Sequence, residues 1–162
     1  MRISKLVLCL GLSWLCACLG SSYHNDRETA DQLSGQGKYE EAVAAYLRHI
    51  KQRLSVKERP KWENPYIYFL DIGDIYLEQG NVTEALRYYQ MAEDKGVKPG
   101  YVNDRYRYVA SWYENQNKLK EALEHLNRFA SKDPFLFGIM QDRIAKRIVA
   151  QEQEKESPDT AP

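Results

Sequence analysis

The sequence lacks an excess of charge of either sign, because lysine and arginine together number 23 and aspartate and glutamate also number 23. Proteins that bind nucleic acid usually carry a basic excess that neutralises phosphates, so this balance argues against a nucleic-acid partner. Proline and glycine are sparse, at 6 and 9 residues, whereas tyrosine is frequent at 12. Alternating apolar runs typical of strands are few, and we therefore expect a helical protein.

Patterns that support catalysis are also missing. The three histidines, His24, His49 and His125, are far apart and share no ligand spacing. The sequence contains no glycine-rich phosphate loop, no Ser-His-Asp arrangement and no metal-binding motif. We therefore predict no enzymatic activity, no cofactor and no metal site.

The longest apolar run, at residues 6–15, is too short for a transmembrane helix, which needs about 20 apolar residues. Two cations, Arg2 and Lys5, precede this run, and small residues follow it. A charged start, a short apolar core and small residues behind it are typical of a secretory signal peptide. The sequence therefore predicts an exported protein.

Residues 15–18, Leu-Cys-Ala-Cys, resemble the lipobox of bacterial lipoproteins, in which a small residue precedes the modified cysteine. Ala17 meets this requirement for Cys18, whereas a leucine precedes both Cys9 and Cys16. The resemblance implies that residues 1–17 are removed, that the Cys18 sulfur receives a diacylglyceryl group, and that its new amine is acylated with a fatty acid such as palmitate. Cys9 and Cys16 would be lost with the leader. The alternative is ordinary cleavage nearby, with Cys18 left as a free thiol.

The lipoprotein resemblance also bears on location. Leu19, rather than an aspartate, follows Cys18. By analogy with enterobacterial sorting, this residue favours the outer membrane, with the protein facing the periplasm. Residues 18–25 would form a short lipidated linker that holds the folded part close to the bilayer.

An internal repeat runs through the rest of the chain. Three stretches, SGQGKYEEA, LEQGNVTEA and ENQNKLKEA, end at Ala42, Ala85 and Ala122. In each stretch a glutamate directly precedes the alanine, and a small residue stands 12 positions before it. Repeats of this kind indicate a stack of similar structural units.

These residues resemble the tetratricopeptide repeat, a helix-turn-helix of 34 residues with the pattern W-x2-L-G-x2-Y…A-x3-F…P. The middle unit matches best, with Phe69, Ile72, Gly73, Tyr76, Ala85 and Tyr89. The first unit matches least, because Asp26 and Thr29 stand where large apolar residues are wanted. The resemblance implies an all-α solenoid of about three helix pairs over residues 26–133. Gly37, Gly80 and Asn117 would supply the turns within the pairs.

The repeats are followed by a predicted capping helix at residues 134–150. Asp133 and Pro134 form a helix start, and an i, i+4 stripe follows, consisting of Leu136, Met140, Ile144 and Ile148. We expect this helix to cover the open end of the stack. Residues 151–162 are polar and contain prolines, which predicts a disordered tail.

Tetratricopeptide proteins usually bind proteins or peptides along a concave groove lined by the first helix of each pair. The resemblance places these residues there: Arg27, Asp31, Ser34, Ile67, Leu70, Asp74, Leu77, Asp104, Arg107, Ser111 and Glu114. The alternative for Leu70 and Leu77 is packing against a neighbouring helix. Asp74, Asp104 and Tyr108 replace the basic and amide residues with which some members hold a peptide's C-terminal carboxylate, so we do not expect such a ligand.

Two functions remain open. The first is a lipid-anchored periplasmic adaptor that binds another envelope protein or peptide during envelope assembly or secretion. The second is a carrier for a small apolar ligand, accessory to a transporter, with the ligand held between Leu70, Leu77 and neighbouring aromatic residues. Trp62 lies in an insertion between the first two units, and an exposed tryptophan there would be a candidate contact residue.

Overall fold

The computed structural model describes residues 25–156, so the expected leader and Cys18 lie outside the described residues. Within residues 25–156 the chain forms seven α-helices and no strand. The helices are α1 (Asp26–Gly35), α2 (Tyr39–Ser55), α3 (Tyr68–Glu78), α4 (Val82–Asp94), α5 (Pro99–Asn115), α6 (Leu119–Phe129) and α7 (Pro134–Glu156). Two short 3-10 turns, η1 (Pro65–Ile67) and η2 (Ala130–Lys132), precede α3 and α7.

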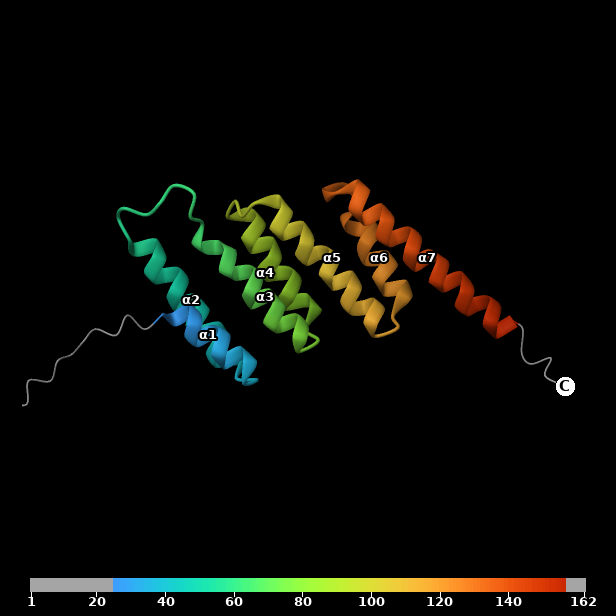
Figure 1. The fold of residues 1–162 in the computed structure, drawn as a ribbon, viewed down its shortest axis with the longest axis horizontal. Helices are drawn as coiled ribbons and strands as arrows, with labels where there is room; N and C mark the ends of the chain where they lie inside the picture. Colours follow the sequence, from blue (N-terminus) through green and yellow to red (C-terminus); the bar gives the residue numbers. More distant parts are fainter. Residues whose placement is uncertain (1–24, 157–162) are drawn as a thin grey trace, which may run out of the picture.

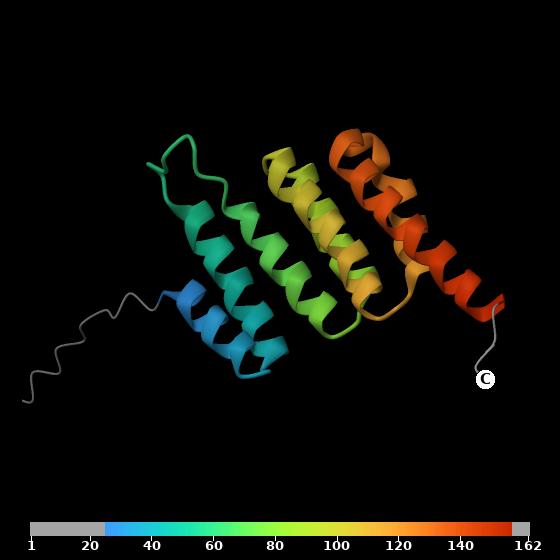
Figure 2. The same ribbon diagram turned by 45° about the vertical axis from the view of Figure 1, so that its right-hand side comes forward.

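The helices form antiparallel pairs that stack in a row (Figures 1 and 2). The closest contacts join α1 to α2, α3 to α4, and α5 to α6, and α7 packs on α6 at the end of the row. Each pair buries its apolar face against the next, as a helical repeat requires. The predicted all-α solenoid with a closing helix is therefore confirmed.

The small residues of the repeat mark the places where the two helices of a pair approach closely. Ala42, Ala85 and Ala122 are all fully buried, at 0% exposure. Gly73 faces one of them across the middle pair: a Cβ at Gly73 would lie 3.1 Å from the Ala85 carbonyl oxygen and 2.3 Å from Cε1 of Tyr89. Only glycine fits this position without moving the buried Tyr89 ring.

The three turns within the pairs share one geometry. Gly37, Gly80 and Asn117 have positive φ angles of 73°, 76° and 56°. In each turn, the next residue's N–H donates to a carbonyl oxygen five residues earlier, at 2.9, 2.8 and 2.9 Å. This is the hydrogen bond that closes a helix end when a left-handed residue follows it, and it confirms the predicted turn positions.

The first pair departs from the repeat pattern at a buried carboxylate. Asp26, which replaces a large apolar residue, is 8% exposed. Its side chain accepts hydrogen bonds from Gln52 at 2.6 Å and from Arg48 at 3.3 Å. Polar partners from α2 therefore compensate the burial of this charge and hold the start of α1 beside the last turns of α2.

The insertion between the first two pairs is an ordered loop. Arg53, at the end of α2, makes two 2.7 Å hydrogen bonds to the Glu63 carboxylate. Asn64 then caps η1 by accepting from the Tyr66 N–H, and Pro65 occupies the first position of that turn. Trp62, between these fixed points, is 82% exposed.

Helix α7 corrects two expectations. Asp133 caps it through the Leu136 N–H, but Leu136 itself is 39% exposed, whereas Phe137 and Ile144 are fully buried. The buried stripe therefore begins at Phe137 instead of Leu136, whereas the other expected positions, Met140, Ile144 and Ile148, do pack on the core. The helix also continues to Glu156, so residues 151–156 are helical rather than part of a tail.

This extension of α7 has a physical basis in its neighbours. Gln151 donates to Asn117 at 2.9 Å, and Glu152 lies 4.0 Å from the Lys120 ammonium. Residues 151–156 also contain glutamine, glutamate and lysine, which favour helix, and no proline.

Candidate functional site

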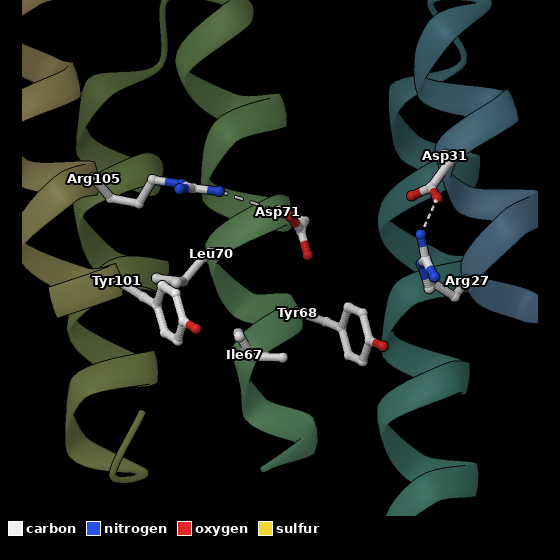
Figure 3. A pocket seen from close by; sticks show the side chains of 8 residues that line it. All are labelled: Arg27, Asp31, Ile67, Tyr68, Leu70, Asp71, Tyr101 and Arg105. Atoms are coloured by element: carbon white, nitrogen blue, oxygen red, sulfur yellow. Dashed lines mark ion pairs between the residues drawn. The ribbon is translucent and has the colours of Figure 1, made fainter. Parts of the chain in front are cut away.

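The first helix of each pair contributes to one hollow. Figure 3 shows α1 on one side of it and α5 on the other, with α3 between them. The hollow has a volume of about 310 Å³. Its lining residues are Arg27, Asp31, Ile67, Tyr68, Leu70, Asp71, Tyr101 and Arg105.

A second hollow of about 400 Å³ adjoins the first between α3 and α5. It is lined by Asp74, Glu78, Asp104, Arg105 and Tyr108. Arg105 lines both hollows, so the two hollows are neighbours along α3 and α5. We refer to these twelve side chains together as the groove.

Arg105 is the central cation of the groove. Its Nε lies 2.8 and 3.0 Å from the two carboxylate oxygens of Asp74. Its terminal nitrogen approaches Asp71 at 3.9 Å, the contact drawn in Figure 3. Arg105 therefore joins α5 to α3, but its contact with Asp71 is longer than a hydrogen bond.

The first two repeats share a tyrosine–aspartate hydrogen bond at the same repeat position. Tyr46 donates to Asp31 at 2.5 Å and Tyr89 donates to Asp74 at 2.7 Å. Burial raises the pKa of both tyrosines above the ordinary value, and the carboxylates add to this effect. These phenols therefore stay protonated and fix the two carboxylates along the groove.

Asp71 is a groove carboxyl whose pKa is raised well above its usual range. Burial between the helices and, to a lesser extent, the nearby Asp74 charge raise its pKa to about 6, against the opposing effect of Arg105. Burial likewise raises the pKa of Asp74, against the effect of Arg105 and the Tyr89 hydroxyl. An added positive charge beside Asp71 would satisfy a carboxylate that Arg105 only partly compensates.

The groove as a whole is acidic and partly aromatic. Among its ionisable side chains, five carboxyl groups stand against two guanidinium groups. Tyr101 and Tyr108 are 49% and 47% exposed. They lie on the same face of α5 as Arg105, because Arg105 follows Tyr101 by four residues and Tyr108 follows Tyr101 by seven. This chemistry suits a segment that carries positive charge and apolar side chains.

The structure places the predicted groove residues unevenly. Six of them line the hollows: Arg27, Asp31, Ile67, Leu70, Asp74 and Asp104. Leu77 is fully buried, at 0% exposure, which corrects its placement in the groove and agrees with the alternative that it packs between helices. Ser34 and Ser111 are half-buried and line neither hollow.

Two further predicted groove residues hold α7 in place instead. Glu114 is bonded to Arg143 at 2.5 Å and to Arg147 at 2.6 Å. Arg107 is bonded to Asp133 at 3.1 Å and to Asp104, and its guanidinium lies 5.6 Å from the centre of the Phe137 ring. Helix α7 therefore occupies the face of α5 that would otherwise be open, which corrects the placement of Arg107 and Glu114.

Sequence reasoning missed five groove residues, namely Tyr68, Asp71, Glu78, Tyr101 and Arg105, and it considered Tyr108 only as a replacement for a carboxylate-binding residue. Asp71 and Glu78 directly follow expected groove positions, and Arg105 directly follows Asp104. The signal that could have revealed the others is the helical spacing of Tyr101, Arg105 and Tyr108, which places three large side chains on one face of α5.

Comparison with protein families decides what this architecture is. A family model described as tetratricopeptide repeat matches residues 28–97 and 70–136. The chain belongs to the tetratricopeptide repeat family. The matched regions overlap and span all three helix pairs and the start of α7. No curated protein matches the chain.

The tetratricopeptide repeats indicate a protein-interaction scaffold, and members of this family are generally not enzymes. Within residues 25–156, no cluster of three or more histidine, cysteine, aspartate or glutamate side chains could hold a metal ion. None of the helices described is both long enough and apolar enough to cross a membrane. The groove is therefore the candidate site for a protein partner.

Proposed function

We propose that the protein is a lipid-anchored periplasmic scaffold whose groove holds an extended segment of another envelope protein. The observation that carries this proposal is the acidic, tyrosine-lined groove on α1, α3 and α5. Tetratricopeptide repeats supply the general protein-binding role. The lipobox-like residues 15–18 support the anchor at Cys18, and Leu19 supports the outer membrane.

The groove also suggests the chemistry of the bound segment. A lysine or arginine of the partner would lie beside Asp71, where Arg105 leaves the carboxylate partly uncompensated at 3.9 Å. An apolar or aromatic side chain next to it would contact Ile67 and Tyr101. A scaffold of this kind would act in envelope assembly or secretion by holding its partner near the bilayer.

The second function from the sequence, a carrier for a small apolar ligand, has less support. Leu77 is fully buried and Leu70 is only 2% exposed, so the two leucines do not enclose a free apolar cavity. Four of the eight residues that line the first hollow carry ionisable acidic or basic side chains. Charged walls favour a polar or charged segment over an apolar molecule.

Site-specific crosslinking tests the groove. A photoreactive amino acid at Tyr101 or Tyr108, introduced in cells that export the protein, should yield one discrete adduct with an envelope protein. The same amino acid at Thr83 or Gln90, which are exposed on α4, is the matched control and should not yield it. Adducts of equal yield at both sets of positions would contradict a groove-specific partner.

Mass spectrometry of the exported protein tests the anchor separately. We expect an N-terminal peptide that begins at Cys18 and carries a diacylglyceryl group and a fatty acid. Cys18→Ser should abolish this modification and release the protein from the membrane fraction. An exported chain that begins at another residue and bears no acyl group would contradict the anchor and leave the groove assignment to the crosslinking result.

A further inference from the structure

All connections between the helix pairs lie at one edge of the stack, the upper edge in Figure 1. This follows from the antiparallel pairing, because the turns within the pairs occupy the opposite edge. We define the loop edge as residues 54–65, residues 95–98, Tyr101, and two residues in the first turn of α7, Phe135 and Leu136. A hollow of about 710 Å³ joins its first two connections and is lined by Lys61, Trp62, Lys95, Lys98 and Tyr101 among others.

Large apolar side chains are unusually exposed along the loop edge. Trp62 is 82% exposed and Phe135 is 75% exposed. Four more large apolar side chains of the loop edge are at least 38% exposed, namely Leu54, Val56, Tyr101 and Leu136. At the opposite edge, the described turn residues at positions 36–38, 79–81 and 116–118 include no large apolar side chain. The apolar exposure is therefore confined mainly to one edge rather than scattered.

Positive charge gathers at the same edge. Residues 54–65 contain three lysine or arginine residues and two glutamates, although the whole chain has no net charge. One glutamate, Glu63, is already paired with Arg53 at 2.7 Å. Lys95 and Lys98 add exposed cations from the next connection. The loop edge is therefore basic, in contrast to the acidic groove.

The two connections are held together, so the charges and the tryptophan form one surface. Asn64 donates through its side-chain amide to the Lys95 carbonyl oxygen at 3.0 Å. The Lys95 ammonium lies 5.5 Å from the centre of the Tyr66 ring. These contacts join the α2–α3 loop to the α4–α5 loop and make the surface continuous.

We propose that the loop edge docks on an anionic phospholipid surface. Tryptophan and tyrosine favour the headgroup level of a bilayer because one side of the ring is apolar and the other end is polar. Lysine and arginine next to them are attracted to anionic headgroups. Trp62 and Phe135 would enter the headgroup region, while Lys57, Lys61 and Lys98 would lie near lipid phosphates.

The path of the chain agrees with this orientation. Asp26 is bonded to Arg48 and Gln52 near the end of α2, so the chain enters the fold not far from the loop edge. Six residues separate Cys18 from Asn25, and an extended chain spans at most about 3.6 Å per residue. An acyl anchor at Cys18 would therefore keep the loop edge near the bilayer, although the proposal does not require that anchor.

Tryptophan fluorescence can report the contact directly. The full chain, with Trp14 and Trp112 replaced by phenylalanine so that only Trp62 emits, is produced in bacteria, purified in detergent and reconstituted with vesicles. The vesicles contain either phosphatidylcholine alone or phosphatidylcholine mixed with phosphatidylglycerol. Lipids brominated near the headgroup then serve as quenchers. We expect blue-shifted Trp62 emission and several-fold stronger quenching with the anionic vesicles, and a loss of this difference at high salt.

Two pairs of charge reversals make the test specific. Lys61→Glu with Lys98→Glu removes cations from the loop edge and should abolish the quenching with anionic vesicles. Lys38→Glu with Lys120→Glu makes the same change in net charge at the opposite edge and should leave the quenching unchanged. A chain in which Trp112 is the emitter, with Trp14→Phe and Trp62→Phe, should show little quenching.

Three outcomes would overturn the proposal. They are equal quenching of Trp62 on neutral and anionic vesicles, equal effects of the two charge-reversal pairs, and protection of Trp62 by an envelope protein extract but not by lipid. Mass spectrometry of the same sample separates the anchor from the loop edge. If the chain carries no acyl group, the anchor is contradicted. Quenching of Trp62 in that same chain would still support the docking surface.

Discussion

Two buried residues, Gly73 and His125, contribute to stability through close contacts with their neighbours. The buried Tyr89 ring leaves no room for a side chain at Gly73. The ring is itself held in place by the 2.7 Å hydrogen bond from the Tyr89 hydroxyl to Asp74. His125, 7% exposed, packs against the Phe129 ring in a tilted arrangement, with 4.8 Å between the ring centres. Its Nε2 is 2.8 Å from the Tyr106 carbonyl oxygen; since a carbonyl oxygen only accepts, Nε2 carries the proton.

Gly73→Ala should destabilise the protein by about 1 to 3 kcal/mol, because the added methyl group overpacks a core that cannot move aside. Gly138→Ala is the matched control: beyond the backbone of α7 itself, nothing lies within 4 Å of a Cβ at Gly138, and alanine should stabilise that helix by roughly 0.5 to 1 kcal/mol. Urea denaturation measures both values. Equal effects of the two substitutions would show that the contact with Tyr89 is not limiting.

Acidification should weaken the fold through His125. Burial lowers the pKa of its imidazole to about 4, below the unfolded value of about 6.5. Above pH 6.5 both states are neutral and His125 has no effect. As the pH falls below 6.5 the unfolded chain binds a proton that the folded chain does not, which lowers the free energy of unfolding by about 2 kcal/mol at pH 5.

The measurement compares urea denaturation of the wild type and His125→Phe at pH 7 and pH 5. Asp71 acts in the opposite direction, since its pKa is raised to about 6, but it is present in both proteins and cancels. When the pH is lowered from 7 to 5, the free energy of unfolding should decrease more for the wild type than for the variant. Parallel curves would contradict a buried neutral histidine.

Among the elements, α7 is the terminal helix that covers the last apolar face of the stack. It packs on α6 and is tied to α5 by Glu114, whose carboxylate binds Arg143 and Arg147. Its apolar side chains divide sharply: Phe137 is 0% exposed and Phe135 is 75% exposed. A terminal helix in a repeat protein protects the last apolar face from water.

Phe137→Ala should therefore cost about 3 to 5 kcal/mol, through lost burial and the cavity left between α7 and its neighbours. Phe135→Ala, two positions away on the exposed face, should change stability by less than about 0.5 kcal/mol. Thermal unfolding of the two variants provides the comparison. A similar loss of stability at both positions would show that Phe137 does not mark the buried face of α7.

The molecule as a whole has no net charge, but the groove and the loop edge carry charge of opposite sign. The groove carries an excess of carboxyl groups, and the loop edge carries an excess of lysine and arginine. The solenoid separates them because the groove lies along the first helices of the pairs, whereas the loop edge lies at their ends. One surface can therefore hold a basic partner while the other contacts an anionic bilayer.

The proposed partner should bind less tightly in acid. Asp71, with a pKa of about 6, is largely ionised at pH 7.5 and largely protonated at pH 5, so it loses its attraction for a cationic side chain. Affinity for the segment identified by crosslinking should fall roughly tenfold between these pH values. Isothermal titration calorimetry measures it, with Asp71→Asn as the control that should bind weakly at both pH values. A step of the same size in Asp71→Asn would assign the pH dependence to another group.

Much of the fold could be predicted from the sequence because it depends on local chemistry. Ala42, Ala85 and Ala122 recur where helices must touch, and Gly37 and Asn117 stand where the backbone needs a positive φ angle. Such requirements repeat with the unit, so they are visible without knowing how the units pack. The helical class, the paired helices and the turn positions follow from them.

The tertiary structure decided which side of each helix remains open. Helical periodicity places residues on a common face, but a rotation of 100° per residue separates Leu136 from the buried Phe137. Neighbouring helices made the other choices: Leu77 is enclosed between pairs, and α7 engages Glu114. The sequence by itself determined a stack of helix pairs, and only the packing of one pair on the next determined the groove, because a surface is what its neighbours leave uncovered.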